Sequence, residues 1–281
     1  VADFAAELRP TVILLENARE LVIGRFSHHL SLLSERLAEQ GYRVDASCHL
    51  LNRFGLPQRR ERALVVAVRA DLPLRTMDDL WAGSRIEPTA THVRRAIGQL
   101  PPLSEGERSP ADPMHVAPRF ATAAARRRMA AIPRDGGSWT DLIGAAGAAR
   151  LLTPAMRDRV RSGALGSHPD VYGRMAWDRS APTIKRECAH VGNGRYAHPE
   201  QDRLASVREM AILQGFPRGY RFGGPSLSNM YRHIGDAVPP LISFQLAGLA
   251  SWILTGAKPE LPDLLLPGAH LRASDIEPIP A

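Results

Sequence analysis

The hydrophobic pattern predicts that strands and helices alternate over about the first seventy residues. Apolar-rich stretches occur at residues 12–15, 42–50 and 63–68. Such stretches are typical of strands that are buried on both faces of a sheet. Between the first two, residues 26–40 carry apolar side chains at helical spacing, and Gly41 ends that pattern. This alternation predicts an α/β fold with a largely parallel sheet.

Regular periodicity is lost after about residue 72, where the sequence becomes rich in Pro, Gly and Arg, and it returns at Pro182. A short strand is expected at residues 183–184, and a helix over residues 206–214 whose start carries a Ser206/Glu209 capping box. A last helix should begin at Pro240 and end before Gly256. The predicted organisation is an α/β segment over residues 1–84, a loop-rich insert over 85–180, a return to the core over 181–256, and a loose Pro-rich tail over 257–281.

Positive charge is concentrated in the middle of the chain. The net charge is +7, and residues 92–179 hold 14 Arg against 8 acidic residues, whereas the rest of the chain is close to neutral. The strong preference for Arg over Lys is what a GC-rich genome imposes, but codon bias does not explain where the charge lies. A localised basic segment is typical of a surface that neutralises nucleic-acid phosphates.

Cysteine and histidine usage argues against several other kinds of site. Two cysteines, Cys48 and Cys188, provide no disulfide framework, and the ten histidines show no ligand spacing, so no metal is expected. The longest uncharged stretch, residues 237–257, contains Pro239 and Pro240, and we interpret it as a buried helix rather than a membrane span. We find no secretory signal pattern and expect a cytoplasmic protein.

Polar side chains follow the predicted strands in two places. Glu16 and Asn17 end the first apolar run, and the carboxyl ends of strands are where open α/β sheets bind ligands. Further along, Gln58-Arg59-Arg60-Glu61-Arg62 leads directly into the third apolar run. Alternate residues of a strand point the same way, so Arg60 and Arg62 should project together. Arginine presents a rigid fork of donors that suits a carboxylate, a phosphate or a carbonyl oxygen.

Together with the C-terminal segments 206–217 and 231–240, these motifs resemble the later motifs of the cytosine-5 DNA methyltransferases, in the family's order. The resemblance covers nearly the whole chain, from residue 4 to about 254. It implies a partial doubly wound, Rossmann-like methyltransferase sheet with an inserted target-recognition domain. The implied reaction transfers a methyl group from S-adenosylmethionine to carbon 5 of a cytosine flipped out of double-stranded DNA, as in bacterial restriction–modification systems.

The resemblance also implies roles for individual residues. In the family a cysteine thiolate adds to carbon 6 of the ring, and an acid at the Watson–Crick edge assists by a proton or hydrogen bond at N3. Glu16 would be that acid, Arg62 would hold the cytosine O2, and Arg60 would orient Glu16 or the target phosphate. Cofactor binding would fall to Gly235, Asp236 and Ala237, and DNA binding to Asn17, Gln58, Arg126, Arg127, Arg128 and Arg174.

Two departures from the family pattern are visible at these motifs. Ala18 stands where the family usually has Val after Glu-Asn, which leaves both polar positions intact. Asp236 stands where the family commonly has Asn, and its negative charge would lie beside the methionine carboxylate of the cofactor. The second departure is expected to weaken cofactor binding at this position.

The sequence lacks the family's Pro-Cys nucleophile motif and its Phe-x-Gly-x-Gly cofactor loop, and we expect Cys48 and Cys188 to be core or near-core residues. We therefore expect the chain to be the C-terminal part of the enzyme, completed by a separate polypeptide or by the rest of a longer chain, and inactive by itself. Two alternatives stay open: a non-catalytic DNA-binding remnant or accessory subunit, and a relative that methylates tRNA.

Overall fold

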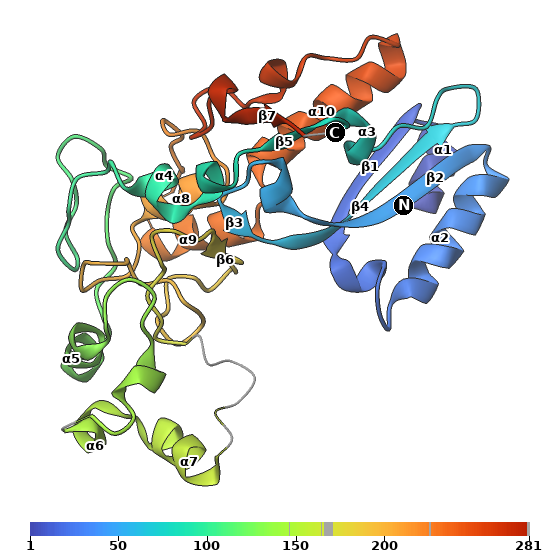
Figure 1. The fold of residues 1–281 in the computed structure, drawn as a ribbon. Coiled ribbons are helices and arrows are strands. Elements are labelled where there is room, and N and C mark those ends of the chain that lie inside the picture. The colour runs from blue at the N-terminus through green and yellow to red at the C-terminus, as the bar shows by residue number, and fades with distance from the viewer. Residues whose placement is uncertain (146, 164, 166–170, 225, 280–281) are drawn as a thin grey trace.

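A three-stranded sheet with helices on both faces forms the N-terminal part of the computed structural model, which describes residues 1–145, 147–163, 165, 171–224 and 226–279 (Figure 1). The strand order is β1-β4-β2. The elements of this part are α1 (Ala2–Leu8), β1 (Val12–Ala18), η1 (Arg19–Leu21), α2 (Ser27–Glu39), β2 (Tyr42–Leu50), η2 (Leu51–Phe54), β3 (Gln58–Arg59), β4 (Glu61–Arg69), α3 (Met77–Leu80) and β5 (Ser84–Ile86).

The three strands predicted within residues 12–68 are present, whereas the short strand expected at residues 183–184 lies instead at Ala181–Pro182. The expectation of a largely parallel sheet is wrong. Strand β4 runs antiparallel to both β1 and β2. A parallel connection needs a crossover of about a dozen or more residues, usually a helix. Between β2 and β4 the chain has only residues 51–60, which form one short turn of helix and β3, so the chain folds straight back. Within this sheet β1 and β2, which are joined through α2, run in the same direction.

The register of this sheet decides which side chains share a face. Residues directly opposite one another in an antiparallel pair lie on the same face. Glu16 is opposite Leu64, whose side chain belongs to the core formed with α3 and α10. Cys48 is opposite Ala63 and so lies on the other face, which is covered by α1 and α2. One face therefore carries Glu16, and the opposite face carries Cys48.

The basic insert and the segment that follows it share a second hydrophobic core, which extends away from the sheet (Figure 1). Side chains from α4, from α5, from the buried helix α8 and from one side of α9 meet in it. The remaining elements are η3 (Pro88–Thr91), α4 (Val93–Ile97), α5 (Ala123–Ala131), η4 (Trp139–Leu142), α6 (Ala148–Leu151), α7 (Pro154–Ser162), β6 (Ala181–Pro182), α8 (Val207–Leu213), α9 (Leu227–Asp236), α10 (Pro240–Thr255), η5 (Leu261–Leu264), η6 (Ala273–Asp275) and β7 (Ile276–Pro278).

Helix α8 is buried along its whole length, and the predicted capping box at its start is confirmed. Ser206 Oγ accepts from the Glu209 amide at 3.1 Å, and the Glu209 carboxylate accepts from the Ser206 amide at 2.7 Å. Both carboxylate oxygens of Glu209 also accept from the guanidinium of Arg203, each at 2.7 Å. Burial raises the pKa of Glu209, but the hydrogen bonds and charge of Arg203 outweigh that effect, and the pKa falls to about 2.

The C-terminal apolar stretch is a core helix, as predicted. Residues 227–255 are long and apolar enough to cross a membrane by length and composition. The helical structure is nevertheless interrupted between α9 and α10 at residues 237–239, and Pro240 opens the second helix. Helix α10 buries Leu241, Leu246 and Leu249 against the sheet. The side of α10 that faces the sheet is therefore accounted for by packing within the protein, whereas its other side, which includes Phe244 and Leu254, is exposed.

The expectation that the Pro-rich C-terminal segment is loose is wrong for residues 257–279. Strand β7 pairs antiparallel with β5, and Leu264 and Leu271 are buried in the core beneath the sheet. The Asp275 carboxylate accepts from Arg95 at 3.0 Å. Proline prevents long helices here, but the apolar residues spaced between the prolines give the segment enough surface to bury.

Candidate active site

The structure brings Glu16, Arg60 and Arg62 together at the edge where β1 ends and β4 begins. The Nε of Arg62 lies 2.8 Å from Glu16 Oε1, and the Nε of Arg60 lies 4.0 Å from the same oxygen. In the ladder Arg62 is opposite Ala18, two residues beyond Glu16, a diagonal separation that a long side chain can span. The predicted meeting of the acid and the arginine pair is present in the fold.

All three side chains of this trio are largely withdrawn from solvent. The side chain of Glu16 is 13% exposed, and those of Arg60 and Arg62 are 6% and 20% exposed. Burial and the neighbouring charge of Arg62 lower the pKa of Arg60 to about 10, so Arg60 still carries its charge at neutral pH. The site is therefore a partly desolvated cluster of one carboxylate and two cations, with a net positive charge.

The hydrogen bonding of the trio is incomplete within the described part of the chain. Arg60 donates from Nη1 to the Ile184 carbonyl at 3.0 Å, but its Nε has no hydrogen-bond partner. The Oε1 of Glu16 is attracted to both guanidinium groups, yet no donor approaches it with hydrogen-bond geometry. Buried polar groups without partners are costly, so this geometry suits a site that a polar ligand completes.

A buried glutamine holds the strand that carries the arginines. The Gln58 side chain is fully buried, donates to Gln214 Oε1 at 2.7 Å and accepts from the Ile184 amide at 2.8 Å. Gln214 in turn donates to the Ala237 carbonyl at 2.9 Å. The DNA-contact prediction for Gln58 is corrected here: its amide is used inside the protein, where it ties β3 to the ends of α8 and α9.

Two of the predicted DNA-binding arginines are structural. The Arg174 guanidinium is fully buried and donates to the carbonyls of Met129, Ile132, His198 and Gln201. Arg128 is also buried, donates to the Leu151 carbonyl and lies over the Tyr172 ring. Because no residue can contact DNA while its charge is buried, these two predictions are corrected. Both arginines instead hold together segments that are distant from one another in the chain.

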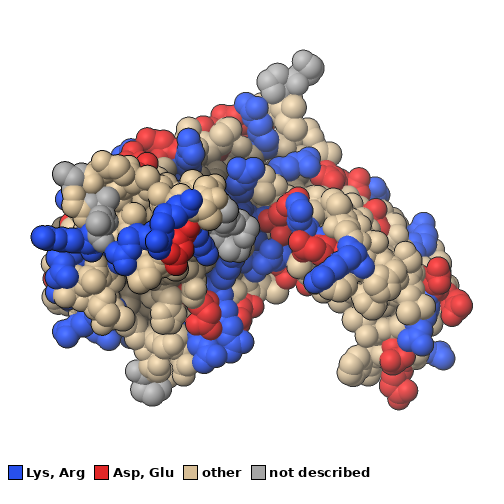
Figure 2. All heavy atoms as spheres, turned by 90° about the horizontal axis from the view of Figure 1, so that it is seen from below, with Lys and Arg blue, Asp and Glu red and all other residues tan. Residues whose placement is uncertain are grey.

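The other predicted DNA-binding residues lie on the surface. Asn17 is exposed at the end of β1, and Arg127 is exposed on α5. Arg126, its neighbour, is exposed as well and pairs with Glu105. Figure 2 shows that Lys and Arg side chains are spread over the insert and gather beside the hollow that separates it from the sheet. This distribution suits the approach of a polyanion, and contact by these three residues stays a prediction.

Neither cysteine is placed to act as a nucleophile at the trio. Cys48 lies on the opposite face of the sheet, with its Sγ 3.7 Å from Glu61 Oε1, and burial and the charge of Glu61 raise its pKa. Cys188 is buried with its Sγ 3.7 Å from the Tyr231 carbonyl, and burial raises its pKa to about 12. A thiol that stays protonated is a poor nucleophile, so the chain itself supplies no reactive thiolate beside Glu16.

The residues predicted to bind the cofactor have different surroundings. Gly235 is buried, and the Ala237 carbonyl accepts a hydrogen bond from Gln214. Of the three residues, Asp236 has the exposed side chain. The Asp236 carboxylate lies 3.5 Å from Arg186 Nη1, and this pairing reduces the like-charge repulsion expected from the change of Asn to Asp. S-adenosylmethionine carries ammonium and sulfonium groups that an exposed carboxylate can attract. Cofactor binding by Gly235, Asp236 and Ala237 stays a prediction.

Replacing Gly235 by Ala should destabilise the protein. A Cβ at this position would lie 2.4 Å from backbone atoms of Lys185 and Arg186, which cannot rotate away. We expect a loss of about 1–3 kcal/mol in the free energy of unfolding, measured by urea titration. Gly219→Ala is the matched control, because nothing lies within 4 Å of a Cβ there. Equal stability of the two variants would contradict this account.

Sequence reasoning missed two neighbours of the site. Tyr196 is buried close to Arg60, and its hydroxyl donates to the Thr183 carbonyl at 2.9 Å. Arg186 neutralises part of the charge of Asp236. Tyr196 is 136 residues from Arg60 in the chain, and Arg186 is 50 residues from Asp236. No local sequence pattern marks either Tyr196 or Arg186. Only the folded arrangement shows their proximity.

Comparison with known proteins identifies the class of protein that this fold and site define. The family model described as "C-5 cytosine-specific DNA methylase" matches residues 1–250. The chain is 33% identical over 258 residues to the type II methylase M.HgiDII of Herpetosiphon aurantiacus, and 30% identical over 248 residues to the type II methyltransferase M.Eco47II of Escherichia coli. The chain belongs to the C-5 cytosine-specific DNA methylase family, whose methyl donor is S-adenosylmethionine, and the resemblance found in the motifs is confirmed at that level.

The matches cover most of this chain but less of its relatives. They span 89% of this chain and 67% of M.HgiDII, 86% and 54% for M.Eco47II, and 87% and 20% for DNA (cytosine-5)-methyltransferase 3 of Arabidopsis thaliana. Among solved structures, a prophage-encoded DNA modification methyltransferase (E. coli) matches with a TM-score of 0.53 at 21% identity, covering 85% of this chain and 68% of that one. This structural likeness confirms the α/β methyltransferase fold.

Proposed function

We propose that the chain supplies the base-binding pocket and the target-recognition region of a DNA (cytosine-5-)-methyltransferase that uses S-adenosylmethionine. The observation that carries this proposal is the position of Glu16 between Arg60 and Arg62, partly buried at the sheet edge with hydrogen-bonding capacity left over. Family membership supports the same reaction. The bacterial type II methylases among its relatives support a role in restriction–modification in the cytoplasm.

The trio can recognise a flipped cytosine through complementary polar groups. Arg62 would donate to the carbonyl O2 of the base, and Glu16 would hold a proton or hydrogen bond at N3, which makes the ring easier to attack at carbon 6. Arg60 would keep Glu16 oriented through its charge. Extrusion of a base costs a few kcal/mol, and contacts of this kind offset that cost. The bound methyl donor supplies the methyl group for carbon 5.

The nucleophile would come from further polypeptide that packs over α1 and α2 and reaches round the β1 edge of the sheet to the face that carries Glu16. Large apolar side chains are exposed on and near α1 and α2: Phe4, Leu8, Ile23, Phe26 and Leu32. Exposed apolar groups gathered in one region are typical of a surface that another protein segment covers. We propose that this segment carries the glycine-rich cofactor loop and the Pro-Cys motif, either in a separate subunit or in the same, longer polypeptide.

The insert would make the DNA contacts outside the pocket. Arg126 and Arg127 on α5 would contact phosphates, and the exposed Asn17 would contact DNA at the end of β1. Contacts with phosphates position the protein, while base contacts specify the sequence.

Methyl transfer from labelled S-adenosylmethionine to duplex DNA tests the proposal. The purified chain alone is expected to transfer none, because its two thiols are protonated or face away from Glu16. Adding a polypeptide with the family's Pro-Cys motif and glycine-rich loop is expected to restore transfer to cytosine. Transfer by the chain alone would contradict the proposal. Duplex binding without any transfer in the combined sample would indicate a DNA-binding accessory protein instead, and transfer to tRNA but not to duplex would indicate a tRNA enzyme.

A further inference from the structure

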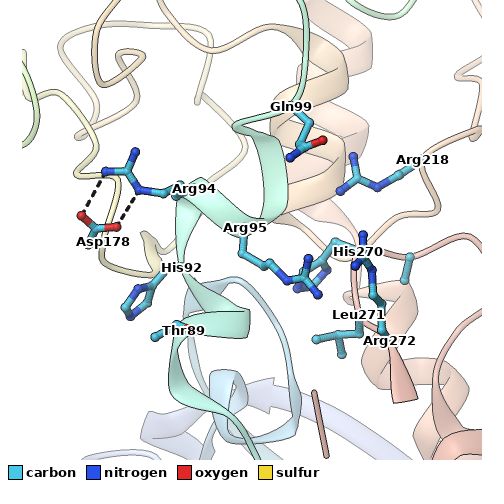
Figure 3. Close-up of a pocket in the computed structure, with 11 residues that line it drawn as sticks. Thr89, His92, Arg94, Arg95, Gln99, Asp178, Arg218, His270, Leu271 and Arg272 are labelled. Carbon is cyan, nitrogen blue, oxygen red and sulfur yellow. Dashed lines mark hydrogen bonds and ion pairs between the residues drawn. The ribbon is translucent and has the colours of Figure 1, made fainter. Parts of the chain in front are cut away.

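A polar cavity that shares no lining residue with the Glu16 trio lies between α4 and the C-terminal segment. Its volume is about 590 Å³. Helix α4 contributes Arg94 and Arg95, and residues 269–272 form the opposite wall, with Arg218 beside them (Figure 3). This volume lies within the range of about 300–1,000 Å³ that is usual for small-molecule sites. The segment predicted to be a loose tail thus forms one wall of a cavity.

The cavity carries more positive charge than its carboxylates can balance. Arg94 makes a bidentate pair with Asp178, at 2.7 and 3.0 Å, and Arg95 lies 3.0 Å from Asp275. Within the described part of the chain no carboxylate pairs with Arg218 or Arg272. Burial and the charges of Arg272 and Arg95 lower the pKa of Arg218. Two guanidinium groups therefore face one cavity without a counter-charge.

A buried histidine adds an unused polar atom to the same wall. His270 is 5% exposed, and its Nε2 has no hydrogen-bond partner among the described residues. Figure 3 shows its ring among the Arg95 and Arg272 side chains. Burial and the charge of Arg218 lower the pKa of His270 to about 4, so the ring is neutral near pH 7. A neutral imidazole nitrogen can accept from a hydroxyl or donate to an oxygen, according to its tautomer.

We propose that this cavity binds a phosphate group. Phosphate oxygens accept the paired donors of guanidinium groups, and inorganic phosphate or a phosphate monoester also offers a hydroxyl to the His270 ring. Binding would supply the counter-charge that Arg218 and Arg272 lack. The phosphate can belong to the DNA backbone or to a free phosphorylated molecule, and both sources present the same chemistry to the site.

The first test measures the binding of inorganic phosphate by titration calorimetry at constant ionic strength. The unmodified chain is expected to bind it saturably, and the double variant Arg218→Gln with Arg272→Gln is expected to bind at least tenfold more weakly. Gln keeps a donor for the Ala96 carbonyl, which Arg218 contacts at 2.9 Å. The control is Arg36→Gln with Arg69→Gln, which removes the same charge from exposed ion pairs elsewhere. Thermal unfolding of each variant confirms that it is folded.

The second test separates the two sources of phosphate. If the ligand is the DNA backbone, the slope of the logarithm of the duplex binding constant against the logarithm of salt concentration should become shallower. Its magnitude should fall by about one for each phosphate that the double variant no longer neutralises. If the ligand is a free phosphorylated molecule, the double variant should bind inorganic phosphate more weakly, but the salt dependence of its binding to duplex DNA should equal that of the unmodified chain. Equal phosphate affinity in all three proteins, or no saturable binding by the unmodified chain, would overturn the proposal. The phosphate titration needs no methyl transfer, so its outcome is independent of the proposed enzymatic function.

Discussion

Glu16→Gln is expected to lower the turnover of the completed methyltransferase by about 10²–10⁴-fold, the usual contribution of general acid–base catalysis. The amide keeps the shape of the side chain but cannot hold a proton for N3 of the base, and it lacks the charge that Arg60 and Arg62 face in the pocket. Affinity for duplex DNA should change little, since most of that affinity comes from phosphate contacts elsewhere.

Single-turnover methyl transfer and fluorescence anisotropy of a labelled duplex separate these two effects. Glu20→Gln is a suitable control, because Glu20 is exposed four residues further on and pairs only weakly with Arg19 at 3.4 Å. It should leave both turnover and affinity unchanged. Equal losses of turnover and DNA affinity in the Glu16 variant would argue that Glu16 shapes the binding surface and takes no part in the chemistry.

Glu209→Gln is expected to remove about 3–5 kcal/mol from the free energy of unfolding, because it leaves the charge of Arg203 buried without its partner. Both side chains of this pair are 1% exposed. The pKa of Glu209, which falls from its ordinary 4.5 to about 2, has the same origin. A carboxyl with a depressed pKa stabilises the fold above about pH 4.5, and this contribution is lost as the pH falls towards 2.

Asp158→Asn provides the matched comparison for this prediction. Asp158 pairs with Arg161 on the surface of α7, where both side chains are well exposed, and such pairs contribute about 0–1 kcal/mol. Urea titration of the two variants should give clearly different midpoints. A Glu209 variant as stable as the Asp158 variant would show that the buried ion pair does not hold α8 in the second core.

Local sequence patterns predicted the elements that are most strongly periodic. Residues 42–50 form a strand with the predicted bounds, the Ser206 capping box is present, and α10 ends before Gly256. These features depend mainly on patterns that short segments of the chain carry by themselves. The meeting of Glu16 with Arg62 was implied by the family resemblance and not by strand geometry, because a parallel sheet would place the end of β1 and the start of β4 at opposite edges.

Other predictions failed where distant residues decide the outcome. Strand direction depends on which strands pair, and β4 enters between β1 and β2 because its connection is too short to cross over. Nothing in the sequence distinguishes Arg128 and Arg174 from exposed arginines. In the fold both are buried, and their guanidinium groups donate to carbonyl oxygens of distant segments. The C-terminal segment is ordered because its apolar side chains pack against residues much earlier in the chain, and because β7 pairs with β5.

The amino-acid sequence by itself determined the class of this protein, the order of its motifs and the identity of the acid and the arginine that meet at the sheet edge. Tertiary structure alone decided which arginines remain exposed to a polyanion, which face of the sheet holds Cys48, and that Arg218, Arg272 and His270 share one cavity. The physical reason is that burial and charge pairing are properties of neighbours in space, and those neighbours lie far apart along the chain.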